Sequence, residues 1–255
     1  MEVESVLVTG ANRGIGLEFV KQLVNLPNPP RFVFATYRDE STTEALKEIR
    51  DACKDTQVVL AKMDITKQNE IEIARKVFEE KLGDKGLSLL INNAGAAKMQ
   101  GFPDITEENM LQHFSTNTVG PVSVVKEMLP LLQKAAAQKS GGMNASRAAV
   151  LNISAMGGSI TQLTDAQPKI FLKAMGYRVS KAALNMAMRI ISITIKDQGI
   201  LIVSMCPGWV KTDMGSDRAA LTVEESVSAM LKTLSQLNEE HHGTFMDRNG
   251  VIAEF

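Results

Sequence analysis

The sequence predicts an α/β fold, a single Rossmann-like doubly wound domain in which a parallel sheet is flanked by helices on both faces. Short apolar segments alternate with longer amphipathic segments along the chain, and a glycine cluster follows the first apolar segment. The apolar segments are continuous rather than alternating, which is typical of strands buried on both faces. Strands of this kind, separated by helices, form a parallel sheet between two helical layers.

The first half of the chain contains four of the expected strands. Residues 5–9, 31–36, 57–62 and 87–92 are short runs of mostly β-branched and other apolar residues. The stretches 15–26, 41–52 and 67–82 between them repeat apolar residues at helical spacing. Pro27, Pro29 and Pro30 are expected to end the first of these helices.

The second half continues the alternation. Residues 148–154 and 201–206 are expected as strands, residues 107–137 as a helix in two pieces, and residues 175–196 and 222–237 as two further helices. The polar stretches 138–147 and 159–174 are expected to be irregular, and neither has the length of a domain linker. We therefore expect one domain over residues 1–255, with its nucleotide-binding part in about 1–120 and its catalytic and substrate part in about 121–255.

The composition favours small-molecule chemistry. With 44% hydrophobic residues, 22% charged residues and a formal net charge of -1, the chain has neither a broad basic field for nucleic acid nor a polybasic segment for a membrane. We expect no secretion signal and no membrane span. Cys53 and Cys206 have no neighbouring metal-ligating residues, so we expect no metal site and a cytoplasmic location.

The glycine cluster predicts a nucleotide site. It lies between the first strand and the first helix, with Gly10, Gly14 and Gly16 in one turn. Glycines there allow a tight turn and a close approach of the backbone to a pyrophosphate, while the helix N-terminus supplies N–H donors. Many turns from strand to helix need glycine for other reasons. The cluster therefore indicates a nucleotide site mainly because it lies between the first strand and the first helix.

The residues after the second expected strand favour NADPH over NADH. An NAD site places an acidic residue there to accept hydrogen bonds from the ribose. Tyr37 occupies that position, Arg38 follows it, and Arg13 lies in the glycine turn, so two guanidinium groups could meet a 2′-phosphate. Two alternatives remain open: the arginines are simply solvated, or Asp39 binds the ribose.

Tyr177 and Lys181 are the candidate catalytic pair. They are four residues apart in an expected helix and so share one of its faces. A neighbouring ammonium favours the phenolate and is expected to lower the pKa of Tyr177 toward a useful acid–base range. The spacing alone is weak, because a tyrosine in a helix is usually a packing residue.

An ordered set of motifs extends over nearly the whole chain. Its members are Thr9–Gly16, Asp64-Ile65, Asn92-Asn93-Ala94-Gly95, Asn117, Tyr177 with Lys181, and Pro207–Thr212. With these motifs in this order, the chain resembles the classical short-chain dehydrogenases/reductases. Within that family it is most similar to the Sniffer-type carbonyl reductases and the related C-factor proteins, through residues 129–132, 147–149 and 207–214.

The resemblance implies a role for each motif. Tyr177 would give a proton to a substrate carbonyl, Lys181 would hold the nicotinamide ribose, and Asn117 would anchor a water. The implied NADPH site comprises Gly10, Arg13, Gly14, Ile15 and Gly16 at the phosphates, Tyr37 and Arg38 at the 2′-phosphate, Asp64 and Ile65 at the adenine, Asn93, Ala94 and Gly95 at the ribose, and Pro207, Gly208, Val210 and Thr212 at the nicotinamide.

One motif departs from the family. Members usually carry a serine that hydrogen-bonds the reacting carbonyl, and Ala155 occupies its position after Ser154. Successive residues of a strand point to opposite faces, so Ser154 could replace that serine only if the strand end bulged or slipped. Ser159 or a water is another possible donor. Met156 and Trp209 are expected to line the substrate pocket, or else to belong to the core.

Three functions follow from these expectations. The first is an oxidoreductase that reduces an aldehyde, ketone or quinone with NADPH. The second is an alcohol or steroid dehydrogenase that works with NAD(P)⁺ in the opposite direction. The third, supported by Ala155, is a weakly active NADPH-binding sensor or signalling protein. The resemblance also implies a homodimer that pairs through the helices of Asn117 and Tyr177.

Overall fold

The structure, a computed structural model that describes residues 2–255, confirms the predicted architecture. Seven strands form one sheet in the order β3-β2-β1-β4-β5-β6-β7, and all the neighbouring pairs are parallel. The strands are β1 (Ser5–Val8), β2 (Phe32–Tyr37), β3 (Gln57–Lys62), β4 (Leu89–Asn92), β5 (Ala149–Ile153), β6 (Leu201–Cys206) and β7 (Phe245–Asp247).

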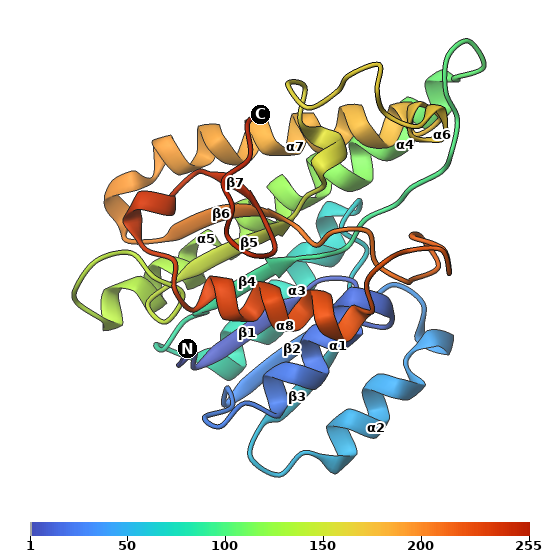
Figure 1. Cartoon of the computed structure of the whole chain (residues 1–255). Helices are drawn as coiled ribbons and strands as arrows, with labels where there is room; N and C mark the ends of the chain where they lie inside the picture. Colours follow the sequence, from blue (N-terminus) through green and yellow to red (C-terminus); the bar gives the residue numbers. More distant parts are fainter. Residues whose placement is uncertain (1) are drawn as a thin grey trace.

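Helices cover both faces of this sheet, as Figure 1 shows. Val6 and Val8 of β1 belong to the core cluster under α1 and α8, whereas Leu7 belongs to the cluster under α3 and α5. The helices are α1 (Gly14–Val24), α2 (Glu44–Ala52), α3 (Gln68–Leu82), α4 (Glu107–Phe114), α5 (Gly120–Gln138), α6 (Lys169–Leu172), α7 (Met175–Thr194) and α8 (Val223–Leu234).

The strand order indicates where on the sheet a ligand would bind. From β1 the chain builds the sheet outward to β2 and β3, and then returns to the other side of β1 to add β4 to β7. The loops after β1 and β4 therefore diverge from neighbouring strand ends. Ligands of open α/β sheets bind in the crevice at such a switch point.

Local sequence explains where several helices begin and end. Thr222 and Glu225 form a reciprocal capping box at the start of α8, and the Thr106 side chain caps α4. The first helix ends at Val24, three residues before Pro27. The expected two-piece helix over 107–137 is also present, because a π-helix, Ser115–Val119, separates α4 from α5.

Two expectations about the second half need correction. The strand β7 was not predicted; it has only three residues and pairs with β6. The stretch 159–174, expected to be irregular throughout, contains the short helix α6 and makes a bridge between Gln100 and Ala174.

Candidate active site

The glycine turn after β1 leaves room that any side chain would fill. Gly10 and Gly14 have φ of 62° and 55°, a region that L-residues with side chains rarely adopt. A Cβ on Gly16 would collide with the Gly10 carbonyl oxygen and the Asn93 amide. The first helical residues, Gly14, Ile15 and Gly16, carry no acidic side chain in their turn. The turn therefore fits a pyrophosphate against bare backbone.

The end of β4 is fastened to this turn. The Thr9 hydroxyl accepts the backbone N–H groups of Asn93 and Ala94, each at 3.0 Å. The Asn93 side-chain amide donates back to the carbonyls of Thr9 and Gly10 at 2.9 and 3.0 Å. A Cβ on Gly95 would lie 3.3 Å from the Asn117 Oδ1 and 3.9 Å from the Lys181 Nζ. The end of β4 thus lies between the nucleotide turn and the side chains of Asn117 and Lys181.

The residues after β2 take distinct positions. The Asp39 carboxylate accepts from the Ser41 backbone N–H and hydroxyl at 3.0 and 2.8 Å, and these bonds hold the pKa of Asp39 below its ordinary value. Because it caps the turn 40–42, this carboxylate is committed to a local role. Arg38 is exposed, and Tyr37 is half-buried.

Arg13 is paired with a carboxylate in this structure. The Arg13 guanidinium makes an ion pair with Asp213, 2.6 Å between Nη1 and Oδ2, across to the loop that follows β6. Both side chains are largely exposed, at 70% and 75%. Of the two arginines expected at the 2′-phosphate, Arg13 is thus held by a carboxylate and Arg38 is exposed.

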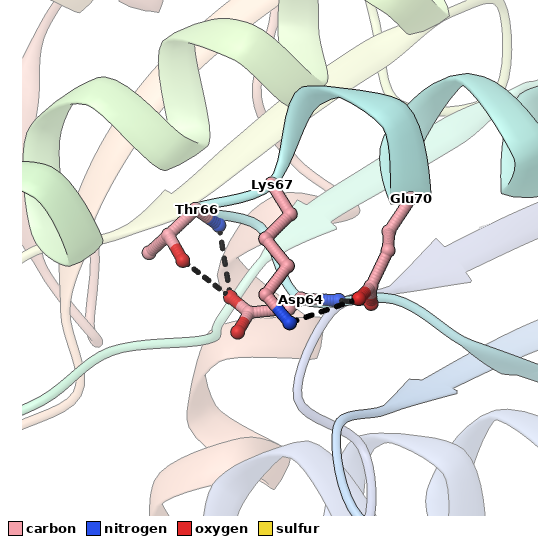
Figure 2. Close-up of polar contacts among 4 residues, drawn as sticks. All are labelled: Asp64, Thr66, Lys67 and Glu70. Atoms are coloured by element: carbon pink, nitrogen blue, oxygen red, sulfur yellow. Dashed lines mark hydrogen bonds and ion pairs between the residues drawn. The ribbon is translucent and has the colours of Figure 1, made fainter.

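Asp64 and Ile65 follow β3 next to the sheet edge. The Asp64 Oδ1 accepts from the Thr66 N–H and hydroxyl, and the Asp64 N–H donates to Glu70, which also pairs with Lys67 (Figure 2). Burial raises the pKa of Asp64, but the Thr66 hydrogen bonds and the nearby positive charges outweigh it and hold that pKa below its ordinary value. Both Thr66 bonds end on Oδ1, so Oδ2 remains available as an acceptor.

The catalytic candidates meet where the π-helix and α7 pack together. The fully buried Asn117 accepts from the Ala96 N–H at 2.8 Å, and its amide donates to the Ala96 carbonyl and the Ser180 hydroxyl at 2.9 and 3.0 Å. Lys181, 4% exposed, donates to the Ile153 carbonyl at 2.7 Å, and its Nζ lies 5.7 Å from the centroid of the Tyr177 ring. The structure brings these three predicted residues together.

The environment moves the pKa values of this pair in a direction the sequence did not suggest. Burial raises the pKa of Tyr177 above its ordinary value, and the neighbouring Cys206 adds to the rise. Burial lowers the pKa of Lys181 to about 8. The expected lowering of the Tyr177 pKa by the ammonium is therefore wrong for the free protein. Tyr177 keeps its proton at neutral pH, which is the state that a proton donor needs.

The end of β5 turns Ser154 away from the cleft. The Ser154 N–H bonds to the Met205 carbonyl at 2.8 Å, so the pairing with β6 continues without a bulge. Ser154 is 1% exposed, and its hydroxyl donates to the Asn185 Oδ1 at 2.7 Å. Ala155 is the next residue of this extended segment and is half-buried. Ser159, the other expected substitute, donates to the Glu254 carbonyl at 2.7 Å.

The loop after β6 completes the site on its open side. Gly208 has φ of 85°, and a Cβ there would approach Leu221 and Arg248. Pro207 accepts from the Ser226 hydroxyl, Val210 bridges to Leu221, and the Thr212 methyl lies 3.3 Å from the position of a Cβ on Gly14. This last contact places the loop directly over the glycine turn.

The two substrate-pocket candidates lie near the strand ends. Trp209, 46% exposed, meets Phe171 of α6 edge to face, with 6.2 Å between ring centroids. Met156 is half-buried, and its N–H donates to the Cys206 sulfur at 3.2 Å. Neither belongs to the two large core clusters, whose members lie beneath the helices.

Sequence reasoning missed several residues of this region. His113 packs edge-on to Tyr177, 6.5 Å between centroids, and its two ring nitrogens bond the Lys98 N–H and the Asn109 carbonyl. Cys206 and Asp213 adjoin the recognised Pro-Gly motif, so their position in the sequence was a usable signal. His113 gave no such signal, because Lys98 and Tyr177, which it contacts, lie outside its own helix. Within residues 2–255 there is no cluster that could hold a metal and no helix able to span a membrane.

Comparisons with known proteins agree with this site. The family model for short chain dehydrogenases matches residues 4–222. The NADPH-bound carbonyl reductase from chicken fatty liver superposes with a TM-score of 0.94 at 41% identity, covering 100% of this chain and 95% of that one. The carbonyl reductase Sniffer of Drosophila melanogaster gives 0.93 at 36% identity and covers 100% of both chains.

A bacterial relative is also similar in sequence. The C-signal protein of Myxococcus xanthus is 36% identical over 166 residues, which cover 65% of this chain and 90% of that protein. The match over residues 4–222, together with the sheet order and the grouping of Asn117, Tyr177 and Lys181, establishes that the chain belongs to the short-chain dehydrogenase/reductase family.

Proposed function

We propose that the protein is an NADPH-dependent carbonyl reductase that reduces aldehydes, ketones or quinones. The observation that carries this proposal is the placement of a protonated Tyr177 one helical turn from the buried Lys181, beside the glycine turn of a nucleotide site. The two solved reductases that resemble the chain over its whole length support the same activity.

The residues present fit NADPH. Bare backbone at Gly10, Gly14 and Gly16 would take the pyrophosphate, and Oδ2 of Asp64 would accept from the adenine amino group with Ile65 beside the ring. The remaining contacts are assigned as Ile15 to the phosphates, Arg13 released from Asp213 together with Tyr37 and Arg38 to the 2′-phosphate, Asn93, Ala94 and Gly95 to the ribose, and Pro207, Gly208, Val210 and Thr212 to the nicotinamide.

The mechanism assigns one task to each catalytic residue. The hydride for the carbonyl carbon would come from NADPH held by the residues named above. The electron pair of the C=O π bond moves onto oxygen, and Tyr177 gives that oxygen its hydroxyl proton. Lys181, an ammonium below about pH 8, stabilises the phenolate left on Tyr177 and holds the nicotinamide ribose. Asn117 holds the loop at Ala96. We also assign to Asn117 the anchoring of a water that would connect Lys181 to solvent.

A cofactor and substrate panel tests this proposal. We expect oxidation of NADPH in the presence of aldehydes, ketones or quinones, with a lower kcat/KM for NADH because only NADPH offers a 2′-phosphate to Arg38. Equal or better use of NADH would contradict the cofactor assignment. Faster oxidation of alcohols or steroids with NAD(P)⁺ than reduction of any carbonyl would favour the dehydrogenase.

A second candidate, an NADPH-binding sensor with little turnover, is favoured by one observation. The strand end at Ala155 presents a methyl group where a hydroxyl could have faced the carbonyl, and Ser154 is committed to Asn185. Tight NADPH binding without reduction of any carbonyl in the panel would support this candidate. The intact group of Asn117, Tyr177 and Lys181 favours the enzyme.

We further propose a single-domain homodimer that works in the cytoplasm. One continuous sheet joins the nucleotide part, about residues 1–120, to the catalytic part, about residues 121–255. The free thiols of Cys53 and Cys206 suit a reducing compartment.

An exposed apolar face supports the dimer. Its members on α4, the π-helix and α7 are Leu111, Phe114, Val119, Val179, Met186, Ile190 and Ile193.

A further inference from the structure

Two side chains of α4 continue a row that ends at Asn117. Asn109, His113 and Asn117 are spaced four residues apart, so their side chains project from one face of the helical segment formed by α4 and the π-helix. All three are buried, with exposed fractions of 2%, 1% and 0%. Asn117 belongs to the catalytic group, whereas the mechanism uses neither of the other two. We call these three residues the helical row.

The helical row holds the backbone of the loop that follows β4. The Asn117 Oδ1 accepts from the Ala96 N–H at 2.8 Å, and its amide donates to the Ala96 carbonyl at 2.9 Å. Two residues further on, the Lys98 N–H donates to the His113 Nε2 at 2.9 Å. The Asn109 amide donates to the Lys98 carbonyl at 3.3 Å. Side chains thus bind both backbone groups of alternate loop residues, as a neighbouring strand would.

The spacings of loop and helix are compatible with this arrangement. Two residues of extended chain span about 6.6 Å, and four residues of helix rise about 6 Å. The histidine also takes a defined tautomer. Because the Lys98 N–H can only donate, Nε2 of His113 is the acceptor, and Nδ1 carries the proton and donates to the Asn109 carbonyl at 2.7 Å. The neutral ring with its proton on Nδ1 is the form that makes both bonds.

The helical row also contacts the start of the helix that carries Tyr177. A Cβ on Gly176 would collide with the Asn109 Oδ1 and the His113 Nδ1, so α7 passes both side chains at close range. Tyr177 is the next residue, and its ring meets the His113 ring edge to face, with 6.5 Å between centroids. His113 therefore contacts both the loop after β4 and the ring of the proton donor.

The loop itself runs from the Lys181 side chain to the start of α7. At the first end, a Cβ on Gly95 would lie 3.9 Å from the Lys181 Nζ. At the other end, the Met175 N–H donates to the Gln100 carbonyl at 3.3 Å, and Gln100 bridges to Ala174. The helical row fastens this loop at its middle, between these two ends.

We propose that His113 is a positioning residue for the carbonyl reduction, which acts through the backbone of Lys98 and the ring of Tyr177. This inference rests on the proposed function and adds to it a residue that works through its neighbours. Without the imidazole, the Lys98 N–H loses its acceptor and the Tyr177 ring loses a contact. The phenol and the loop beside Lys181 are then no longer held in one geometry. A misplacement of about 1 Å can cost about 10²-fold in rate.

Two substitutions at position 113 test the inference. His113→Leu removes the acceptor and keeps an apolar side chain of moderate size. With NADPH and the best carbonyl of the panel at saturation, we expect its kcat to fall about 10- to 10²-fold. Its NADPH affinity, measured by fluorescence titration, should change less than about threefold. In His113→Gln the amide oxygen can again accept from the Lys98 N–H, so kcat should return to within about threefold of the wild type.

His242→Leu is the matched control. The His242 Nδ1 accepts from the Ile202 N–H at 3.1 Å, and its Nε2 donates to the Ser192 carbonyl at 2.9 Å, so this ring also makes one bond of each kind. Ile202 lies at the start of β6, at the opposite edge of the sheet from the site. His242→Leu should therefore lower stability in urea, as His113→Leu does, but leave kcat within about twofold of the wild type.

The outcomes separate a positioning role from a structural one. A His113→Leu protein that is less stable but has undiminished kcat would overturn the inference and leave carbonyl reduction intact. So would a His113→Gln protein that folds and binds NADPH but remains as slow as His113→Leu. Should His113→Leu not fold, His113→Asn replaces it with the same expectation, because its shorter amide does not reach the Lys98 N–H. A wild type that binds NADPH but reduces no carbonyl would overturn the proposed function, and this role with it.

Discussion

At the scale of single residues, burial decides the protonation states of the catalytic pair. Tyr177 and Lys181 are one helical turn apart, and that spacing was readable from the sequence. Burial raises the pKa of Tyr177 and lowers that of Lys181, and each shift favours the neutral form of the side chain. Burial comes from the packing of the π-helix and the β5 end on α7, which no local sequence window contains.

The buried Lys181 is predicted to reduce the stability of the free protein. Its pKa falls from 10.5 in the unfolded chain to about 8, so the folded protein binds fewer protons between these values and stability rises with pH across that window. Below about pH 8 the cost is about 3 kcal/mol. Lys181→Met should therefore raise the free energy of unfolding at pH 7 while abolishing carbonyl turnover.

Urea unfolding at pH 7 and at pH 10 checks this prediction. The gain from Lys181→Met should shrink at the higher pH, where the wild-type lysine is already neutral in the folded state. Lys126→Met, at an exposed position of α5, is the matched control and should change little. A variant less stable than the wild type at pH 7 would mean that the hydrogen bond to Ile153 outweighs the cost of burial.

Ser154 illustrates the limit of residue-scale prediction. Strand alternation indicated that Ser154 and Ala155 face opposite sides, and the structure agrees with it. The possible bulge could not be excluded from the sequence, because the partner that fixes the hydroxyl, Asn185, lies 31 residues away on another element.

At the scale of elements, the regular parts of the fold were predictable and the irregular ones were not. The predicted strands 31–36, 57–62 and 201–206 agree with β2, β3 and β6 to within one residue at either end. Their long apolar runs give a clear signal. The three residues of β7 are too few for one, and the π-helix at Asn117 differs from an α-helix only in its hydrogen bonding.

The loop after β6 is predicted to compete with the cofactor for an arginine. Asp213 holds the Arg13 guanidinium in the free protein, and the 2′-phosphate of NADPH requires the same group. Exposed ion pairs are worth about 0.2–1 kcal/mol. Asp213→Asn should therefore tighten NADPH binding by about 1.4- to fivefold and leave NADH binding unchanged.

Fluorescence titration with each nucleotide measures this effect. Asp217→Asn removes the same charge from the same exposed loop, where it makes no ion pair among the described residues, and it serves as the control. If Asp213→Asn weakened NADPH binding, the ion pair would instead hold the loop closed over the nucleotide. A similar gain for NADH would point to general charge rather than to the 2′-phosphate.

At the scale of the whole molecule, the strand order explains why residues from distant parts of the sequence meet. The switch point between β1 and β4 places the glycine turn beside Ala94. Ala155 and Trp209 follow the ends of β5 and β6 at the same edge of the sheet, where α7 brings Tyr177. This convergence was predictable from the fold class. The conformation of the segment 159–174, with its short helix α6, was not, because it depends on tertiary contacts of this segment.

The exposed face of α7 is predicted to be a dimer interface. Val179, Met186, Ile190 and Ile193 follow one stripe of the helix and are 43–62% exposed. A charge in the stripe would be buried without a partner, so Ile190→Asp should convert a dimer into a monomer. Light scattering after gel filtration measures the mass. Ile73→Asp, on the equally exposed surface of α3, should remain dimeric, and a monomeric wild type would refute the dimer.

The role of Tyr177 is tested most directly by Tyr177→Phe, which removes one hydroxyl and keeps the ring against His113 and Lys181. NADPH affinity should stay within about twofold of the wild type, while kcat for carbonyl reduction should fall by about 10²–10⁴. Undiminished turnover in a variant that binds NADPH normally would show that another group donates the proton, and the mechanism derived from this site would be wrong.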